Sequence, residues 1–198
     1  MLTLIDNGHG RQTRGKRSPD GSVEEWRVNR QLARRLLTLL QQAGEPAALL
    51  VPEDDDIPIS TRRRRIMQHA ARLGAPDVRL ISIHCNAAAD GSHWSTARGW
   101  SVYLHTDAKP ADIRLATQLA QAVRQACFSI RRPGPAHPYW TAPLALLRDL
   151  PLAACLTENL FMDNRDDCLM LRQPHILDRL AEALANGLIG EAQPRPAL

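Results

Sequence analysis

Cysteine is scarce and scattered in this sequence. The chain has 198 residues and four cysteines, no two of which form a CxxC pair. Three of the four lie inside apolar runs, so we expect buried free thiols. The cysteine pattern therefore excludes a small fold held together by disulfide bonds.

Long apolar runs are also missing. No run approaches the roughly 20 residues that a membrane-spanning helix requires. The N-terminus lacks a basic segment followed by a long apolar one, so no secretory signal is visible. We therefore expect a soluble protein that is made in the cytoplasm, and any export would need another route.

The sequence contains neither an internal repeat nor a linker between domains. Its length suits one sizeable domain, and its 44% of apolar residues is enough for a folded core. We expect this domain to span residues 1–190, followed by a frayed tail at residues 191–198, and we favour a monomer. The net charge of +4 favours an anionic partner such as a nucleic acid, a membrane surface or a cell-wall polymer, without choosing among them.

Strand-like and helix-like segments alternate along the first half of the chain. Such alternation is typical of crossover connections between parallel strands. It predicts an α/β fold, with a single domain built on a twisted, mostly parallel sheet that carries helices on both faces. The expected strands are residues 2–5, 47–51, 78–83, 99–104, 144–147 and 153–157, the expected helices are residues 24–43, 60–73, 111–127 and 174–189, and the expected irregular segments include the acidic loop 52–58 and the proline-rich stretch 131–143.

Three chemically capable side chains follow or end predicted strands. His9 comes just after the first strand, in "LIDNGHG", His84 directly follows "VRLISI", and Glu158 directly follows "AACLT". Ligands of an open α/β sheet bind at the carboxyl ends of its strands. Either histidine alone is more often a structural residue, but the coincidence of all three favours a functional site.

The helix that begins near "SVEEW" offers a fourth group. One interpretation is a capping box, with Ser22 as the N-cap and Glu25 at the third helical position. At about 100° per residue, however, Glu25 projects within roughly 20° of Leu32, the middle of the apolar stripe, whereas Glu24 falls about 80° away. A carboxylate that faces the core needs a partner, for which a cation is suited. Two histidines and one glutamate form a catalytic zinc set with a fourth position left for water.

Five segments, in chain order, match the motifs of one enzyme family. "IDNGHG" resembles its D-P-G-H-G segment, "EWRVNRQLARRL" its second-ligand segment and "LISIHCNA" its S-I-H-A-N-A segment. "GWSVYL" resembles a G-V-E-V-Y strand, and "LLRDLPLAACLTENLFMDN" resembles a segment in which a glutamate precedes G-F-L-S-N. The chain thus resembles the zinc-dependent N-acetylmuramoyl-L-alanine amidases of the Amidase_3 type, which include cell-wall amidases and phage endolysins. The resemblance covers nearly the whole chain, with departures at Asn7, Cys85 and Asn159-Leu160.

This resemblance implies a site and a reaction. It implies that His9, Glu25 and His84 hold Zn²⁺, the only cofactor expected, and that Glu158 is the catalytic general base. The family's second-ligand glutamate lies four residues before an asparagine or similar residue, which also selects Glu25 over its neighbour. The implied reaction is hydrolysis, in peptidoglycan, of the amide between the lactyl group of N-acetylmuramic acid and L-alanine of the stem peptide.

Two further residues are candidates for contact with this substrate. Asn86 lies in the same segment as His84. Arg148 matches an arginine that recurs in the family, and it would hold Glu158 or a substrate carboxylate.

The chain has no obvious cell-wall-binding module and no long insert of the kind that holds an autoinhibitory helix. It therefore looks more like a phage endolysin, with the bacterial cell wall or periplasm as its site of action, than a secreted cell-division enzyme.

Two alternatives stay open, one a related enzyme and one from another class. A zinc peptidase that cuts another amide of the stem peptide would use the same residues. A basic nucleic-acid-binding domain without catalysis would use the arginine run at residues 62–65, and it predicts steep salt dependence. No nucleic-acid motif is recognisable, and a solvated helix face is the commoner explanation of such a run. We therefore expect peptidoglycan as the partner, with no nucleic acid and no membrane span.

Overall fold

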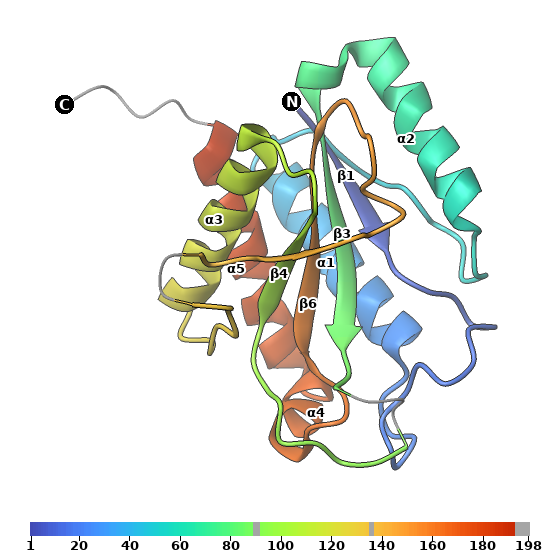
Figure 1. Cartoon of the computed structure of the whole chain (residues 1–198), viewed down its shortest axis with the longest axis vertical. Helices are drawn as coiled ribbons and strands as arrows, with labels where there is room; N and C mark the ends of the chain where they lie inside the picture. The colour runs from blue at the N-terminus through green and yellow to red at the C-terminus, as the bar shows by residue number, and fades with distance from the viewer. Residues whose placement is uncertain (89–91, 135–136, 193–198) are drawn as a thin grey trace.

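The computed structural model describes residues 1–88, 92–134 and 137–192. A six-stranded sheet forms the centre, and helices cover both of its faces (Figure 1). The strands are β1 (Leu2–Asn7), β2 (Ala47–Leu49), β3 (Val78–Asn86), β4 (Ser101–His105), β5 (Trp140–Ala142) and β6 (Ala153–Phe161). The helices are α1 (Glu25–Gln42), α2 (Ile59–Leu73), the 3₁₀ turn η1 (Ala75–Asp77), α3 (Pro110–Gln125), α4 (Arg165–Leu171) and α5 (Pro174–Ala192).

The sheet has the strand order β2-β1-β3-β6-β4-β5. All neighbouring strands are parallel except β4 and β6, which are antiparallel. The carboxyl ends of β1, β3 and β6 therefore meet at one edge of the sheet, where open α/β folds bind ligands. In the register of β3 against β6, His84 lies opposite Glu158.

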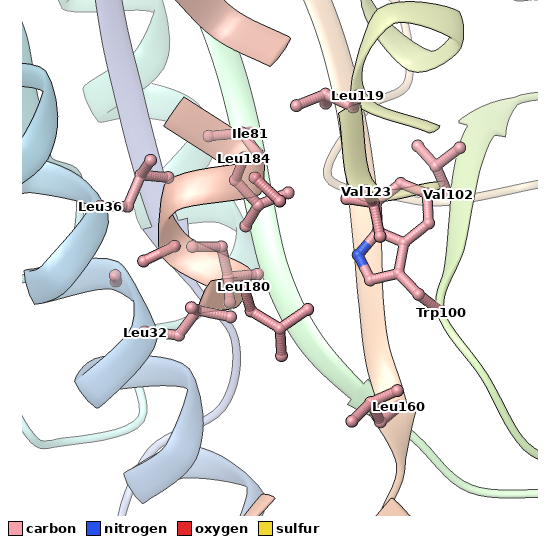
Figure 2. Close-up of a cluster of buried hydrophobic side chains, with 14 of the residues drawn as sticks. Leu32, Leu36, Ile81, Trp100, Val102, Leu119, Val123, Leu160, Leu180 and Leu184 are labelled. Atoms are coloured by element: carbon pink, nitrogen blue, oxygen red, sulfur yellow. The ribbon is translucent and has the colours of Figure 1, made fainter. Parts of the chain in front are cut away.

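Two hydrophobic clusters lie on the two faces of the sheet. On one face, α1 and α5 pack Leu32, Leu36, Leu180 and Leu184 together, and Trp100 lies in the same cluster (Figure 2). On the other face, α2 and the chain at residues 144–152 bury a smaller cluster. Because side chains alternate along a strand, β3 contributes to both clusters. The face of the sheet that α2 covers also carries the polar side chains near the carboxyl ends of β1, β3 and β6.

The expected α/β fold is confirmed, with three local differences. Residues 144–147 form a turn and not a strand, because their leucines pack against α2 and Arg63 donates hydrogen bonds to the carbonyls of that turn. β5 lies inside the stretch that was expected to be irregular, and the short helix α4 was not expected at all. An apolar run of four residues is too short for periodicity to separate a strand from a buried turn.

Three further expectations concern membrane spans, the C-terminal tail and the cysteines. Within the described residues, no helix combines the length and hydropathy that a bilayer crossing demands. α5 continues to Ala192, and the rest of the expected tail, residues 193–198, lies outside the described residues. Cys85, Cys155 and Cys168 are buried free thiols as expected, whereas Cys127 is an exposed free thiol.

Candidate metal centre

The two glycines around His9 make room for its neighbours. β1 ends at Asn7, and His9 then adopts a left-handed backbone conformation with φ of 61°. A Cβ atom on Gly8 would lie 2.1 Å from Cε1 of His84, so the His84 ring rests against a backbone that has no side chain. A Cβ atom on Gly10 would lie 2.1 Å from the backbone nitrogen of Asp56. The G-H-G sequence is therefore required by close packing on both sides of the histidine.

Glu25 is the first residue of α1 and points into the protein. It is 1% exposed, and the backbone N–H of Cys85 donates a hydrogen bond to its Oε1 atom at 3.2 Å. Glu24 instead forms an ion pair with Arg27 at 2.5 Å, and its side chain is 41% exposed. The capping box is absent, because the N-cap position is Glu24 and no side chain caps the helix there.

His9, Glu25 and His84 converge at the edge of the sheet. The His9 Nε2 atom lies 3.4 Å from Glu25 Oε2, and the His84 Nδ1 atom lies 3.0 Å from Glu25 Oε1. A tetrahedral zinc ion with bonds of about 2.0–2.1 Å would separate neighbouring ligand atoms by about 3.3 Å. The two separations from Glu25 are close to this value, and one ligand atom from each of the three residues lies within 4.8 Å of the others. In the described part of the chain, this is the one group of three His, Cys, Asp or Glu residues close enough to share a metal ion.

Burial and mutual charge set the ionisation of this cluster. Burial lowers the pKa of His9 to about 4, although the charge of Glu25 opposes the shift. His9 is therefore neutral near pH 7 and offers a lone pair, as a metal ligand must. Burial raises the pKa of Glu25, but the hydrogen bond and charge of His84 outweigh it, so the net shift is downward. The side chains of His9 and His84 are 21% and 17% exposed, which leaves the cluster open to small molecules.

Glu158 lies beside the cluster on β6. It is directly opposite His84 in the parallel register, so the two side chains share a face of the sheet. Its Oε2 atom is buried and has no hydrogen-bond partner among the described residues. Burial raises the pKa of Glu158 to about 7, with His84 opposing the shift and Glu25 adding to it. A carboxyl group in this state can both accept and release a proton near neutral pH.

The end of β6 contains a conformation that the sequence did not reveal. Leu160 has a φ of 70°, and the pairing of β3 with β6 shifts register between His84 and Asn86. The Asn159 side chain bridges this irregularity: its Nδ2 atom donates to the His84 carbonyl, and its Oδ1 atom accepts from Trp100 Nε1, both at 2.9 Å. Asn159 therefore holds the backbone of His84.

The two predicted substrate-contact residues lie in different places. Asn86 is the last residue of β3, and its carbonyl accepts a hydrogen bond from the Met162 N–H. Arg148 is exposed in the turn before β6, where its carbonyl accepts from Arg63. Their contacts with substrate stay predictions.

A cavity of about 460 Å³ adjoins the two histidines. It runs between the end of the acidic loop and the turn that precedes β6. Its walls are mainly apolar, and the buried pair of Asp6 and Arg62 contributes to its lining. The apolar lining residues are Ile57, Pro58, Ile59, Leu144, Ala145, Leu146 and Leu156.

The sequence of this chain is similar to those of known proteins. The model of the Amidase_3 family, N-acetylmuramoyl-L-alanine amidase, matches residues 3–190. The endolysin of Bacillus phage SPP1 is 27% identical over 189 residues, which cover 94% of this chain and 64% of the relative. The sporulation-specific N-acetylmuramoyl-L-alanine amidase of Bacillus subtilis (strain 168) is 28% identical over 186 residues, covering 93% of this chain and 66% of that protein. The chain thus spans just under two thirds of the length of these curated relatives.

Solved structures share the fold. The catalytic domain of CwlV, an N-acetylmuramoyl-L-alanine amidase from Bacillus (Paenibacillus) polymyxa var. colistinus, superposes with a TM-score of 0.79 at 20% identity, covering 96% of this chain and 97% of that one. The apo form of the amidase Ami1 from Mycobacterium abscessus gives a TM-score of 0.81 at 17% identity, covering 97% and 98% of the two chains. Because the family model spans residues 3–190, the chain belongs to the Amidase_3 family of N-acetylmuramoyl-L-alanine amidases.

Proposed function

We propose that this protein is a zinc-dependent amidase of peptidoglycan, which hydrolyses the bond between N-acetylmuramic acid and the L-alanine of the stem peptide. The observation that carries the proposal is the cluster of His9, Glu25 and His84 with Glu158 beside it, in a chain of this family. The names of the relatives, an endolysin and a sporulation amidase, agree with this activity.

His9, Glu25 and His84 would hold the metal. Two imidazole nitrogens and a carboxylate suit Zn²⁺, and three protein ligands leave a fourth position open. When bound, Zn²⁺ supplies Lewis-acid chemistry, which polarises the scissile carbonyl and makes water more acidic. The adjoining cavity gives a substrate access to this side of the cluster.

Glu158 would carry the proton. Its unpartnered Oε2 atom is free to accept a proton from the attacking water. With a pKa of about 7, the same carboxyl group can then pass that proton to the departing amine of L-alanine. Asn86 and Arg148 would contact the substrate, Asn86 from the end of β3 and Arg148 from the turn before β6.

The test is product analysis on purified peptidoglycan. An amidase releases intact stem peptides with a free L-alanine amine and leaves the glycan strand whole, and elemental analysis should find one Zn²⁺ per chain. A peptidase with the same metal would instead expose an amine within the stem peptide. Release of internal fragments, or no hydrolysis by the zinc-loaded protein, would overturn the proposal.

A further inference from the structure

One member of the arginine run of α2 is buried and does not belong to a solvated face. Arg62 is only 2% exposed, and Arg30 of α1 is only 4% exposed. The two guanidinium groups come from different helices and meet at one backbone atom, the carbonyl oxygen of His9. Arg30 Nη1 donates to this oxygen at 3.1 Å, and Arg62 Nη2 donates to it at 3.3 Å.

Arg62 connects this carbonyl to the sheet. Its Nη1 atom donates to Asp6 Oδ1 at 2.7 Å and to the Asn7 carbonyl at 2.9 Å. The second oxygen of Asp6 accepts from the Ser82 hydroxyl at 2.5 Å. The buried ion pair is therefore fully hydrogen-bonded, which is the condition under which a buried charge is tolerated.

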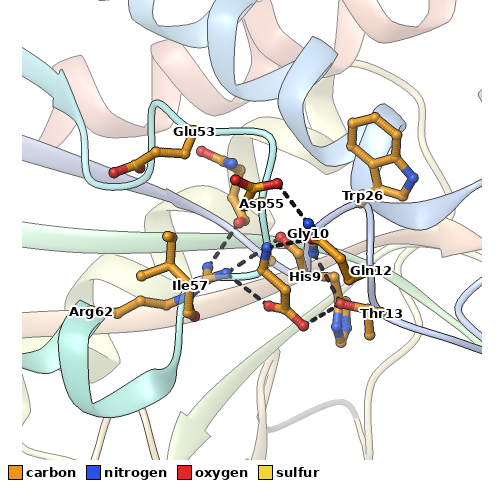
Figure 3. A network of polar contacts seen from close by, with 12 residues as sticks. His9, Gly10, Gln12, Thr13, Trp26, Glu53, Asp55, Ile57 and Arg62 are labelled. Atoms are coloured by element: carbon orange, nitrogen blue, oxygen red, sulfur yellow. Dashed lines mark hydrogen bonds and ion pairs between the residues drawn. The ribbon is translucent and has the colours of Figure 1, made fainter.

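Arg30 connects the same carbonyl to the acidic loop, residues 52–58. Its Nε and Nη2 atoms donate to the Glu53 carbonyl at 3.0 and 2.8 Å, and Nη2 also reaches the Asp55 carbonyl at 3.3 Å. The acidic loop in turn binds the segment after His9: the backbone N–H of Asp56 donates to the Gln12 side chain at 2.9 Å (Figure 3). The contacts form one continuous network around His9.

This network bears on the direction of the His9 ring. A left-handed backbone is unfavourable for a residue other than glycine, and it persists only where the surroundings hold it. Hydrogen bonds from charged donors are the strong ones. We propose that Arg30 and Arg62 are positioning residues, which fix the His9 backbone so that Nε2 faces Glu25 before any metal binds.

The proposal rests on the proposed function in one respect, the role of His9 as a metal ligand. It predicts that loss of either arginine weakens zinc binding without removing any ligand. Groups that orient a metal ligand from behind change metal affinity by 10–100-fold in general. Arg65 provides a matched control, because it binds the Glu53 carboxylate of the same acidic loop and the Leu50 carbonyl just before that loop.

The experiment is a Zn²⁺ titration against a competing chelator, with Arg30→Met, Arg30→Lys, Arg62→Lys and Arg65→Met in the full chain. Cooperative thermal unfolding in chelator checks that each variant is folded. We expect Arg30→Met to bind zinc roughly 10–100-fold more weakly than the parent. The zinc affinities of Arg30→Lys and Arg62→Lys should lie between those of Arg30→Met and the parent. Arg65→Met should bind zinc as tightly as the parent. At saturating zinc, activity should largely return in the arginine variants.

Each outcome bears on one of the two proposals. A parent protein that binds no zinc overturns the proposed function, and this inference with it. A parent that binds zinc, with folded Arg30 and Arg62 variants of unchanged affinity, overturns the inference alone. Equal weakening by Arg65→Met also overturns it, because the effect would then belong to the acidic loop as a whole. If Arg30→Met does not fold, the two lysine variants decide.

Discussion

His9 and Glu158 reach the same cluster from strands on either side of β3, but the chain fixes them by different means. His9 lies beyond its strand, in a left-handed conformation, and two buried arginines hold its carbonyl. Glu158 lies within a strand, and the sheet register alone sets its place. A loop ligand therefore needs dedicated polar contacts, whereas a strand residue can be left with an unsatisfied carboxyl oxygen. Burial of that carboxyl group, together with the charge of Glu25, raises the pKa of Glu158 to about 7.

The largest expected effect is on the metal itself. Glu25→Ala should reduce the zinc content from about one ion per chain to almost none, because it removes one of only three protein ligands. Glu24→Ala should keep the metal, since that carboxylate pairs with Arg27 at the surface. Elemental analysis of both proteins measures this. The reverse pattern would show that the helix register of the proposed ligand is wrong.

Glu158→Gln should separate catalysis from metal binding. Turnover should fall by roughly 10²–10⁴, the usual contribution of a general base, while zinc content and fold stay as in the parent. Hydrolysis of purified peptidoglycan, with zinc measured on the same sample, gives both numbers. Activity within a few-fold of the parent would contradict the assignment of the base.

Gly8→Ala should damage the ligand geometry without touching a ligand. The new Cβ would lie 2.1 Å from Cε1 of His84, so the ring must move. We expect zinc affinity to fall by about 10–100-fold, as it does when the orientation of a ligand is lost. Gly190→Ala is the control, because a Cβ there meets nothing within 4 Å. Equal zinc affinity in the two variants would show that the His84 ring has more freedom than its packing indicates.

The smallest effect should appear in the stability of the metal-free protein. The pKa of Glu158 is raised to about 7 from an ordinary 4.5, so the folded state retains a proton that the unfolded state releases between these two values. The contribution of Glu158 to stability should therefore fall as pH rises through this window. His9, with a pKa lowered to about 4, titrates in the same range with the opposite sign in both proteins, so the informative quantity is the difference between parent and variant. Denaturant unfolding in chelator at pH 4.5 and pH 8 should show that raising the pH is less favourable to the stability of the parent than to that of Glu158→Gln. An identical pH dependence in both would place the titration elsewhere.

The sequence predicts the centre of the site better than its support. His9, His84 and Glu158 each follow a predicted apolar strand, and strand ends of an α/β sheet converge, although β3 and β6 in fact continue past His84 and Glu158. The inward direction of Glu25 follows from its angle on the helix. The burial of Arg62 does not follow, because a run of four arginines on a helix looks the same whether one member is inside or all are outside. Asn159 gives no signal either, since its role depends on a register shift between two strands that are distant in sequence.

The thiols have a practical consequence for work with this protein. Of the four cysteines, all in the described part of the chain, only Cys127 is exposed. Cys85 lies next to His84, and burial, with the charges of Glu25 and Glu158, raises its pKa well above the usual range. The thiolate is the nucleophile that attacks alkylating reagents, so a fluorophore should attach selectively to Cys127, just past the end of α3, without any engineered residue. Slow labelling of Cys85 would then report the opening of the core around the candidate metal centre.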